Sequence, residues 1–285
     1  MRSFAILIPN YSGAAFIVDT VNRFSKGFPG ILILVVDDAS PDDSVTKLLT
    51  TSAKIIVREK NGGFAAAVNT GLEYLDGAGV DYVLIANSDV VVDEVKCAAI
   101  AAAICSPMLP QKTAVLGFLE ESVKHNAINK GSNISGFLFA LNIDIVKDVG
   151  LFDENFYMYG EEQDYFRRIE DAGFRIQQTE IRVQHLAEGS GGGKLRNSWL
   201  AIRNSLYLET KRLNLWSTCK KAGVLFLLIN RLYRPKAGED PSLRRVLRPG
   251  IILGNLFLFL ALSWNAVKLL QIKKYEIQSK SRNKV

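Results

Sequence analysis

The residues of this sequence best suited to chemistry are a set of carboxylates and one histidine. Most of them follow an apolar run or open a helix-like segment, positions from which a side chain can reach a ligand. The set comprises Asp37 and Asp38, Asp89, the group Glu161, Glu162 and Asp164, and finally His185. Carboxylates bind hard divalent cations and remove protons from hydroxyl groups. These residues therefore predict a polar site for a metal ion, a phosphate group and proton transfer.

The elements that must position these side chains alternate along the first hundred residues. Expected strands cover residues 4–8, 31–36, 54–57 and 82–86, and expected helices cover residues 15–24, 42–50, 64–74 and 94–105. Strands that alternate with helices predict a parallel sheet with right-handed crossovers. In such sheets ligands bind at the carboxyl ends of the strands. Asp37, Asp38 and Asp89 fall at these ends, so we expect them to share one site.

The regular alternation stops after residue 106. Residues 108–133 read as a loop that includes a short strand, and Gly189–Gly193 reads as a flexible segment. Further strands are expected at residues 114–118, 134–141 and 175–179, and further helices at residues 161–172 and 199–211. The chain of 285 residues therefore predicts an α/β fold, with a mostly parallel, Rossmann-like central sheet flanked by helices.

The chain divides by charge into an acidic body and a basic C-terminal region. Residues 1–193 hold 16 Lys or Arg against 25 Asp or Glu, whereas residues 194–285 hold 19 against 4. We expect residues 1–215 to form the main domain and residues 216–285 to form a helical, basic extension. The basic residues flank apolar stretches, and aromatic residues are not spaced among them. An anionic membrane surface is therefore the expected partner, and nucleic acid is not.

The apolar stretch Pro249–Val267 carries no charge over its 19 residues. This is close to the length that a membrane-spanning helix needs. A spanning helix, a helix lying in the membrane interface, and a helix that closes the domain or forms a dimer all remain open. No basic-then-apolar leader precedes the first expected strand, so we expect no signal peptide.

Each acidic group also has an explanation that involves no ligand. Asp38 would form a turn, Asp89 would cap the following helix, and the acids at 161–164 would offset a helix dipole. The segment Asn61-Gly62-Gly63 precedes a helix of small residues. Its N–H groups would either face a bound anion or belong to a simple tight turn.

Taken together, these segments resemble the inverting glycosyltransferases of family 2, whose catalytic domain has the GT-A fold, and especially their rhamnosyltransferase-like branch. The resemblance runs from residue 4 to about residue 210, and its later part is the most specific. Asn10-Tyr11-Ser12 is similar to the family's Asn-Tyr-Asn, and Asn87-Ser88-Asp89 to the branch's Asn-Pro-Asp. The matching segments are Ile8–Ser12, Val36–Ser40, Asn61–Gly71, Asn87–Val90, Gly136-Phe137, Gly150–Phe156 and Tyr159–Arg167.

The resemblance implies a role for each candidate residue. Glu162 stands at the position of the catalytic base, as Glu where the family has Asp. Asp89 and His185 would hold Mg²⁺ or Mn²⁺ on the diphosphate of a nucleotide-sugar. Asn87 replaces an acid that other branches carry, which puts strict metal dependence in question. On the acceptor side the resemblance implies Gly136, Glu161 and Asp164, and on the donor side Pro9, Tyr11, Asp37, Asp38, Asn61, Gly63, Asn69, Asn87, Ser88 and Arg203.

The implied activity is transfer of a sugar, best matched by rhamnose from dTDP-rhamnose, to a lipid-linked or polysaccharide acceptor. The protein would act at the cytoplasmic face of the cell membrane, as a peripheral or singly anchored protein and as a monomer or homodimer. Two alternatives are a UDP- or GDP-sugar transferase and, because of Asn87, an inactive nucleotide-sugar-binding subunit. The chain lacks the Gly-x-x-x-x-Gly-Lys-Ser/Thr and Gly-x-Gly-x-x-Gly spacings, which argues against a kinase and a dehydrogenase.

Overall fold

A computed structural model describes most of the chain as two compact units. The first unit comprises residues 1–190 and the second comprises residues 191–285. The described residues are 2–121, 134–186, 194–212, 215–230 and 250–282. Residues 122–133 of the expected loop at 108–133, and all of Gly189–Gly193, lie outside these residues.

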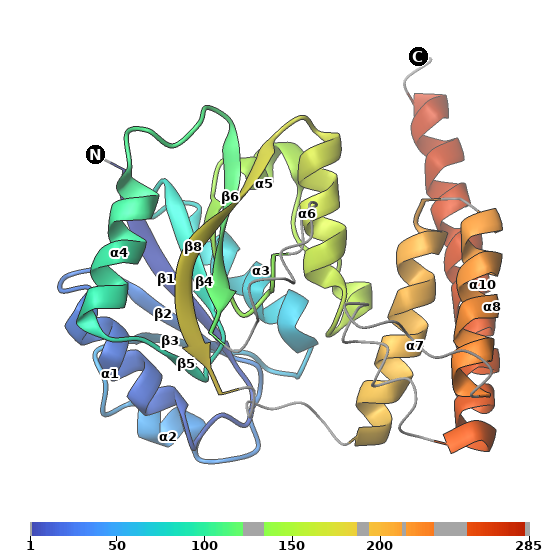
Figure 1. The fold of residues 1–285 in the computed structure, drawn as a ribbon, viewed down its shortest axis with the longest axis horizontal. Coiled ribbons are helices and arrows are strands. Elements are labelled where there is room, and N and C mark those ends of the chain that lie inside the picture. Colours follow the sequence, from blue (N-terminus) through green and yellow to red (C-terminus); the bar gives the residue numbers. More distant parts are fainter. Residues whose placement is uncertain (1, 122–133, 187–193, 213–214, 231–249, 283–285) are drawn as a thin grey trace. The chain divides into compact units, whose positions relative to one another are not determined.

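A sheet of eight strands occupies the centre of the described part of the first unit (Figure 1). Its strand order is β3-β2-β1-β4-β7-β6-β8-β5. The first four strands in this order pair in parallel, β7 runs antiparallel to β4 and β6, β8 is parallel to β6, and β5 is antiparallel to β8. The strands are β1 (Phe4–Asn10), β2 (Ile33–Asp37), β3 (Lys54–Val57), β4 (Tyr82–Ala86), β5 (Val90–Val91), β6 (Thr113–Glu120), β7 (Leu138–Asn142) and β8 (Arg175–His185).

Helices cover both faces of this sheet, because the central strands are apolar on both sides. In β1, Ile6 and Ile8 belong to the core beneath α1 and α4, whereas Leu7 belongs to the core beneath α3 and α6. This explains why these strands read as unbroken apolar runs. The helices of the unit are α1 (Ile17–Gly27), α2 (Ser44–Leu48), α3 (Gly63–Leu75), α4 (Glu94–Cys105), α5 (Ile145–Val149), the short 3₁₀ helix η2 (Glu154–Phe156) and α6 (Glu161–Asp171).

The predicted α/β class and mostly parallel sheet are confirmed. The strands expected at 54–57 and 82–86 and the helix expected at 94–105 have the observed bounds. The strand expected at 175–179 instead continues to His185. Its second half is only partly buried, and its pairing with β6 shifts register. This half alternates polar residues with Ile181 and Val183 and contains no apolar run, so a prediction based on apolar runs missed it.

The second unit contains three described helices, α7 (Lys194–Thr210), α8 (Leu215–Ile229) and α10 (Gly250–Arg282). Ile202 and Leu206 of α7 pack with Leu225 of α8 and with Leu258 of α10 in one small core. Because α7 shares this core, the compact units divide at residue 190, close to the change of charge after residue 193, whereas the expected domains divide at residue 215. Gly250–Ile272 is long and apolar enough to cross a membrane, and 22% of its most apolar stretch is buried.

Candidate functional site

The site lies at the edge of the sheet where six strands end. β1, β2, β3, β4, β6 and β8 run in one direction, so their carboxyl ends meet at this edge. Pro9 is buried within β1, and Tyr11 is half-buried directly after that strand. The polar residues at these ends are Asn10, Asp37 with Asp38, Asn87 to Asp89, Glu120 and His185. The edge therefore brings together His185 and three of the carboxylates that the sequence singled out.

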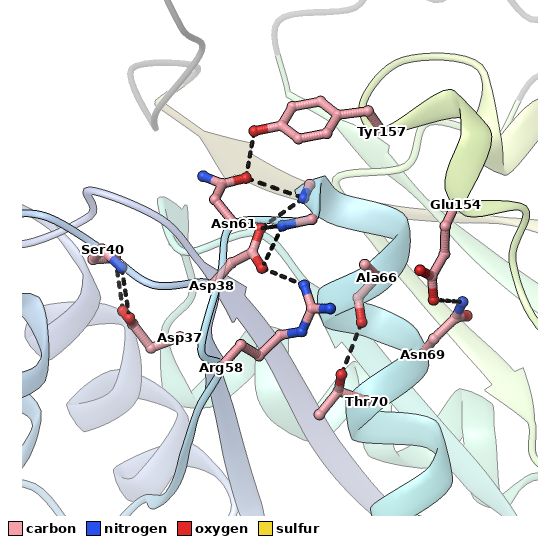
Figure 2. Close-up of polar contacts among 12 residues, drawn as sticks. Asp37, Asp38, Ser40, Arg58, Asn61, Ala66, Asn69, Thr70, Glu154 and Tyr157 are labelled. Atoms are coloured by element: carbon pink, nitrogen blue, oxygen red, sulfur yellow. Dashed lines mark hydrogen bonds and ion pairs between the residues drawn. The ribbon is translucent and has the colours of Figure 1, made fainter.

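Asp37 uses its carboxylate to shape the loop that follows β2. The side chain is buried and accepts hydrogen bonds from Asn10 Nδ2 at 2.7 Å. It also accepts hydrogen bonds from Ser40 N at 2.9 Å and from Ser40 Oγ at 2.7 Å (Figure 2). Both carboxylate oxygens are thus bound within the protein. The carboxylate of Asp37 thus holds the loop at residues 37–40, and its expected contact with the donor stays a prediction.

Asp38 caps the N-terminus of α3 (Figure 2). Its carboxylate accepts hydrogen bonds from Gly62 N at 3.0 Å and Gly63 N at 2.7 Å, and it forms an ion pair with Arg58. Helix N-termini favour negative charge, because their first N–H groups are unpaired and aligned with the helix dipole. The glycine N–H groups were expected to face a bound anion. In this structure the anion that they face is Asp38, and the expected contact of Gly63 with the donor stays a prediction.

Two asparagines predicted to bind the donor instead connect α3 to the segment that precedes α6. Asn69 is buried, and its Nδ2 donates to Phe152 O at 3.0 Å and to Glu154 Oε1 at 2.9 Å. Its Oδ1 accepts from Phe152 N at 2.9 Å. Asn61 Oδ1 accepts from the Tyr157 hydroxyl and from Gly63 N. Both side chains therefore hold the fold together at this point, and the donor contacts expected of them stay predictions.

Asp89 and His185 form a close pair at the ends of two strands. Asp89 has 2% of its surface exposed, and its Oδ1 lies 3.1 Å from His185 Nε2. The pairing of β5 with β8 creates this contact, because Val90 is in register with His185. Asp93, and not Asp89, caps the following helix by accepting from Lys96 N. The helix-cap explanation of Asp89 is therefore excluded.

Asn87 and Ser88 complete the loop around this pair. Asn87 Nδ2 lies 3.3 Å from His185 Nε2, and Asn87 N donates to Phe137 O at 2.8 Å. Ser88 is buried, and its carbonyl accepts from Thr20 Oγ1 at 2.8 Å. Asn87 thus lies beside the Asp89–His185 pair, whereas Ser88 fixes the loop on α1.

One carboxylate and one imidazole are suitable ligands for Mg²⁺ or Mn²⁺. In the described ranges no three His, Cys, Asp or Glu side chains gather into a closed metal site. A cation held by Asp89 and His185 would therefore need further ligands, and the oxygens of a diphosphate and water are chemically suited to supply them. The residues present fit an open metal site of this kind.

Glu162 lies at the start of α6, with its side chain over Gly136. A Cβ added at Gly136 would lie 3.3 Å from Glu162 Cγ and 3.4 Å from Cδ. The next residue, Phe137, stacks on His185 with ring centroids 5.1 Å apart. Glu162 and the Asp89–His185 pair thus flank the same two residues. The carboxylate of Glu162 and the pair suited to a cation therefore lie at one edge of the sheet.

The two acids beside Glu162 have different surroundings. Glu161 is 4% exposed, and no described residue forms a hydrogen bond with its Oε2. Burial, followed by the negative charge of Glu162, raises the pKa of Glu161 well above its usual value. Asp164 is buried and binds Arg168 Nε at 3.0 Å, and Arg168 also donates to the carbonyls of Val149 and Leu151. Asp164 thus anchors α6, and its expected place on the acceptor side stays a prediction.

The raised pKa of Glu161 predicts how stability depends on pH. A carboxyl whose pKa is raised by folding favours the folded state below its unfolded pKa, and this contribution is lost as pH rises through the folded pKa. Glu161→Gln should therefore raise the melting temperature by a few degrees at pH 8, with a difference that shrinks towards pH 4. Glu73→Gln, at an exposed position of α3, is the control. Equal shifts for both variants at pH 8 would contradict the expectation.

Three residues that hold this site together were missed in the sequence. Arg168 follows Asp164 by four positions on one helix, a spacing that favours an ion pair and would have revealed it. Arg58 and Tyr157 gave no such signal, because their partners Asp38 and Asn61 lie 20 and 96 positions away. Contacts at such separations depend on the fold and not on local spacing.

Arg203 belongs to the second unit. Its guanidinium lies over the Trp264 ring, 4.7 Å from the centroid, and its Nε donates to Asn204 Oδ1 at 2.8 Å. These contacts connect α7 to α10. Its expected contact with the donor stays a prediction.

Comparison with known proteins identifies the architecture. Residues 5–133 match the model of glycosyl transferase family 2. A mannosyltransferase from Pyrobaculum calidifontis, in complex with GDP-Man and Mn²⁺, is similar with a TM-score of 0.59 at 13% identity, over 98% of this chain and 80% of that chain. Glucosyl-3-phosphoglycerate synthase from Mycobacterium tuberculosis, with Mn²⁺, UDP-Glc and phosphoglyceric acid, gives a TM-score of 0.54 at 14% identity, over 77% and 80%. No curated protein sequence matches the chain.

These matches agree with the geometry described above. The expected GT-A fold is confirmed, with a mostly parallel central sheet between helices and an additional C-terminal helix. The matches do not distinguish the rhamnosyltransferase-like branch from other branches. The chain carries a glycosyl transferase family 2 match over residues 5–133 on a GT-A fold, and this combination supports a transferase activity.

Proposed function

We propose that the protein is an inverting glycosyltransferase that uses a nucleotide-sugar donor and a divalent cation. One observation carries the proposal: Glu162 and the Asp89–His185 pair flank Gly136 and Phe137 at the carboxyl edge of the sheet. Inverting transfer needs a base on the side opposite the leaving group. A carboxylate beside Gly136 and a metal-suited pair beside the next residue, Phe137, support a base and a leaving-group site at the same edge.

The chemistry follows from these positions. Glu162 accepts the proton of an acceptor hydroxyl, and the hydroxyl oxygen forms a bond to the anomeric carbon of the sugar. The bond from that carbon to the diphosphate breaks, and the nucleoside diphosphate leaves with the electron pair. Asp89 and His185 would hold Mg²⁺ or Mn²⁺, which supplies positive charge to the diphosphate when bound.

We favour one donor and keep two other donor classes as alternatives. Asn87-Ser88-Asp89 resembles the rhamnosyltransferase-like branch and favours dTDP-rhamnose. The solved structures that share the fold carry GDP-Man and UDP-Glc, which keeps UDP- and GDP-sugars as the alternative. The proposed acceptor is a lipid-linked or polysaccharide hydroxyl. The inactive-subunit alternative loses support, because Glu162, Asp89 and His185 are all present at one edge.

A thermal-shift series with dTDP, UDP and GDP, each with and without Mn²⁺, tests this proposal. A ligand at a hundred times its Kd stabilises the native state by about 2.7 kcal/mol. For a domain of this size the expected rise in melting temperature is on the order of 5 °C for the matching base. Asp89→Asn should remove the part of the shift that depends on Mn²⁺. No shift with any nucleotide, with or without Mn²⁺, would contradict the proposal.

We further propose that the second unit binds an anionic membrane surface. Ile252, Phe259 and Leu270 of α10 are exposed apolar side chains, and residues 194–285 are strongly basic. α7 packs along α10 and carries Arg196 and Arg203. A spanning α10 would draw these charges towards the hydrocarbon, at a cost of about 2.5–3.5 kcal/mol for each at the centre of the bilayer. We therefore favour a peripheral helix at the cytoplasmic face.

Flotation of the full chain with anionic and neutral vesicles tests this arrangement. Phe259→Glu places a charge on the exposed face of α10, where 66% of the side chain is accessible, and should reduce flotation several-fold. Leu195→Glu, at a position on α7 that is 52% exposed, is the matched control and should float as the unaltered chain does. Equal flotation of both variants would exclude this face. Loss of a dimer in Phe259→Glu without loss of flotation would assign the face to a second copy.

A further inference from the structure

The segment Tyr157–Gly160 joins η2 to α6 and holds an uncommon backbone conformation. Tyr157, Tyr159 and Gly160 have φ angles of 64°, 75° and 97°. Residues with a side chain rarely adopt positive φ, and they keep it only where surrounding contacts hold them. Two tyrosines in this conformation, directly before the helix that carries Glu162, therefore need specific support.

The support comes from the N-terminus of α3. The Tyr157 hydroxyl donates a hydrogen bond to Asn61 Oδ1, above the turn that Asp38 caps (Figure 2). The Tyr157 carbonyl packs against Gly63 so closely that a Cβ at Gly63 would lie 2.0 Å from the carbonyl oxygen. Asn61 Oδ1 also accepts from Gly63 N at 3.1 Å. The segment thus rests on the same turn of α3 that Asp38 fixes to the end of β2.

The far end of the segment meets Glu162. Gly160 N donates to Glu162 Oε2 at 3.3 Å, and the Glu162 side chain lies over Gly136. A movement of the segment would carry Gly160 with it and change the direction of the Glu162 carboxylate. A continuous series of contacts therefore runs from Asp38 through Asn61 and Tyr157 to Glu162.

We propose that Tyr157 is a positioning residue whose hydroxyl, bound to Asn61, holds residues 157–160 so that the Glu162 carboxylate points at the acceptor hydroxyl. This inference rests on the proposed role of Glu162 as the base. Tyr157 acts through the backbone and takes no proton. Its effect falls on the rate of transfer and not on the binding of the donor.

Tyr157→Phe tests the inference, because it keeps the ring that packs on α3 and removes only the hydroxyl. The assay measures release of nucleoside diphosphate from dTDP-rhamnose, UDP-glucose and GDP-mannose in the presence of Mn²⁺. Loss of one hydrogen bond that positions the base should lower kcat about tenfold and leave the donor KM within about twofold. Tyr74→Phe, at an exposed tyrosine of the same helix α3, should match the unaltered protein.

A double-mutant cycle shows whether Tyr157 and Asn61 act as one link. Tyr157→Phe combined with Asn61→Ala should lower kcat no further than Asn61→Ala alone. An unchanged kcat in Tyr157→Phe, or fully additive losses, would overturn the inference. Loss of turnover can also arise only because Tyr157→Phe unfolds at a lower temperature. If its kcat is normal well below its melting temperature, the inference is overturned as well.

The failure of this inference can be told apart from failure of the proposed function. If the unaltered protein releases nucleoside diphosphate from none of the three donors, the proposed function fails. A crystal structure of Tyr157→Phe then decides the positioning role by itself. Displacement of the Glu162 carboxylate from Gly136 would support the role, and an unchanged carboxylate would refute it.

Discussion

Glu162→Gln is expected to lower sugar transfer by about 10²–10⁴-fold, the range over which a positioned general base contributes to rate. Glutamine has nearly the shape of glutamate and keeps an oxygen that can accept from Gly160 N, but it cannot take up the acceptor proton. Donor binding should therefore persist, and the thermal shift with nucleotide and Mn²⁺ should equal that of the unaltered protein. Release of nucleoside diphosphate and formation of glycosylated product measure the loss.

The control for this change is Glu170→Gln, at an exposed position near the end of the same helix. It removes one negative charge from α6 without approaching Gly136, and it should retain transfer within about twofold. Turnover by Glu162→Gln within tenfold of the unaltered rate would remove Glu162 as the base. The Asp89–His185 pair would then have to be explained without it.

Gly63→Ala should destabilise the protein by about 3 kcal/mol or more, because it combines two separate penalties. Gly63 has a φ of 83°, a conformation that side chains disfavour. The added Cβ would also lie 2.0 Å from Tyr157 O and 2.7 Å from Tyr157 C, so the backbone on one side must move. Urea denaturation measures the lost free energy of unfolding. The variant and the unaltered protein are compared with the same dependence of that free energy on urea concentration.

Gly77→Ala supplies the matched control for this glycine. Among the described residues no atom lies within 4 Å of a Cβ built at Gly77. The same substitution there should be neutral or stabilise the chain by about 0.4–1 kcal/mol through the unfolded state. If Gly63→Ala unfolded at the same urea concentration as Gly77→Ala, the packing of the Tyr157 carbonyl on α3 would be disproved.

The strands and helices of the body could be predicted from sequence, because their apolar runs are long and their ends are marked. Residues 54–57, 82–86 and 94–105 have the predicted bounds. The short elements α5 and η2 were missed, since five and three residues show no periodicity. The second half of β8 was missed because it alternates polar and apolar residues and contains no apolar run.

The sequence predicted that Asp89, His185 and Glu162 lie close together, but it did not predict which other polar residues bind groups of the protein. The sequence alone does not distinguish a strand-end carboxylate that binds a ligand from one that binds another part of the same chain. Asp89 and His185 do lie together, and Glu162 shares their edge. Asp38 and Asn69 instead bind groups of the protein 24 and 83 residues distant. Only the folded chain shows which polar groups already have partners.

The reversed direction of β7 decides how the edge of the sheet is divided. A strand that runs against its neighbours begins where they finish, so the chain enters β7 at the carboxyl edge of the parallel strands. Had β7 been parallel, Gly136 and Phe137 would start it at the opposite margin, about 16 Å away over five residues. The antiparallel strand thus places Gly136 beside Glu162 and Phe137 beside His185. Two adjacent backbone positions therefore set the spacing between Glu162 and the Asp89–His185 pair.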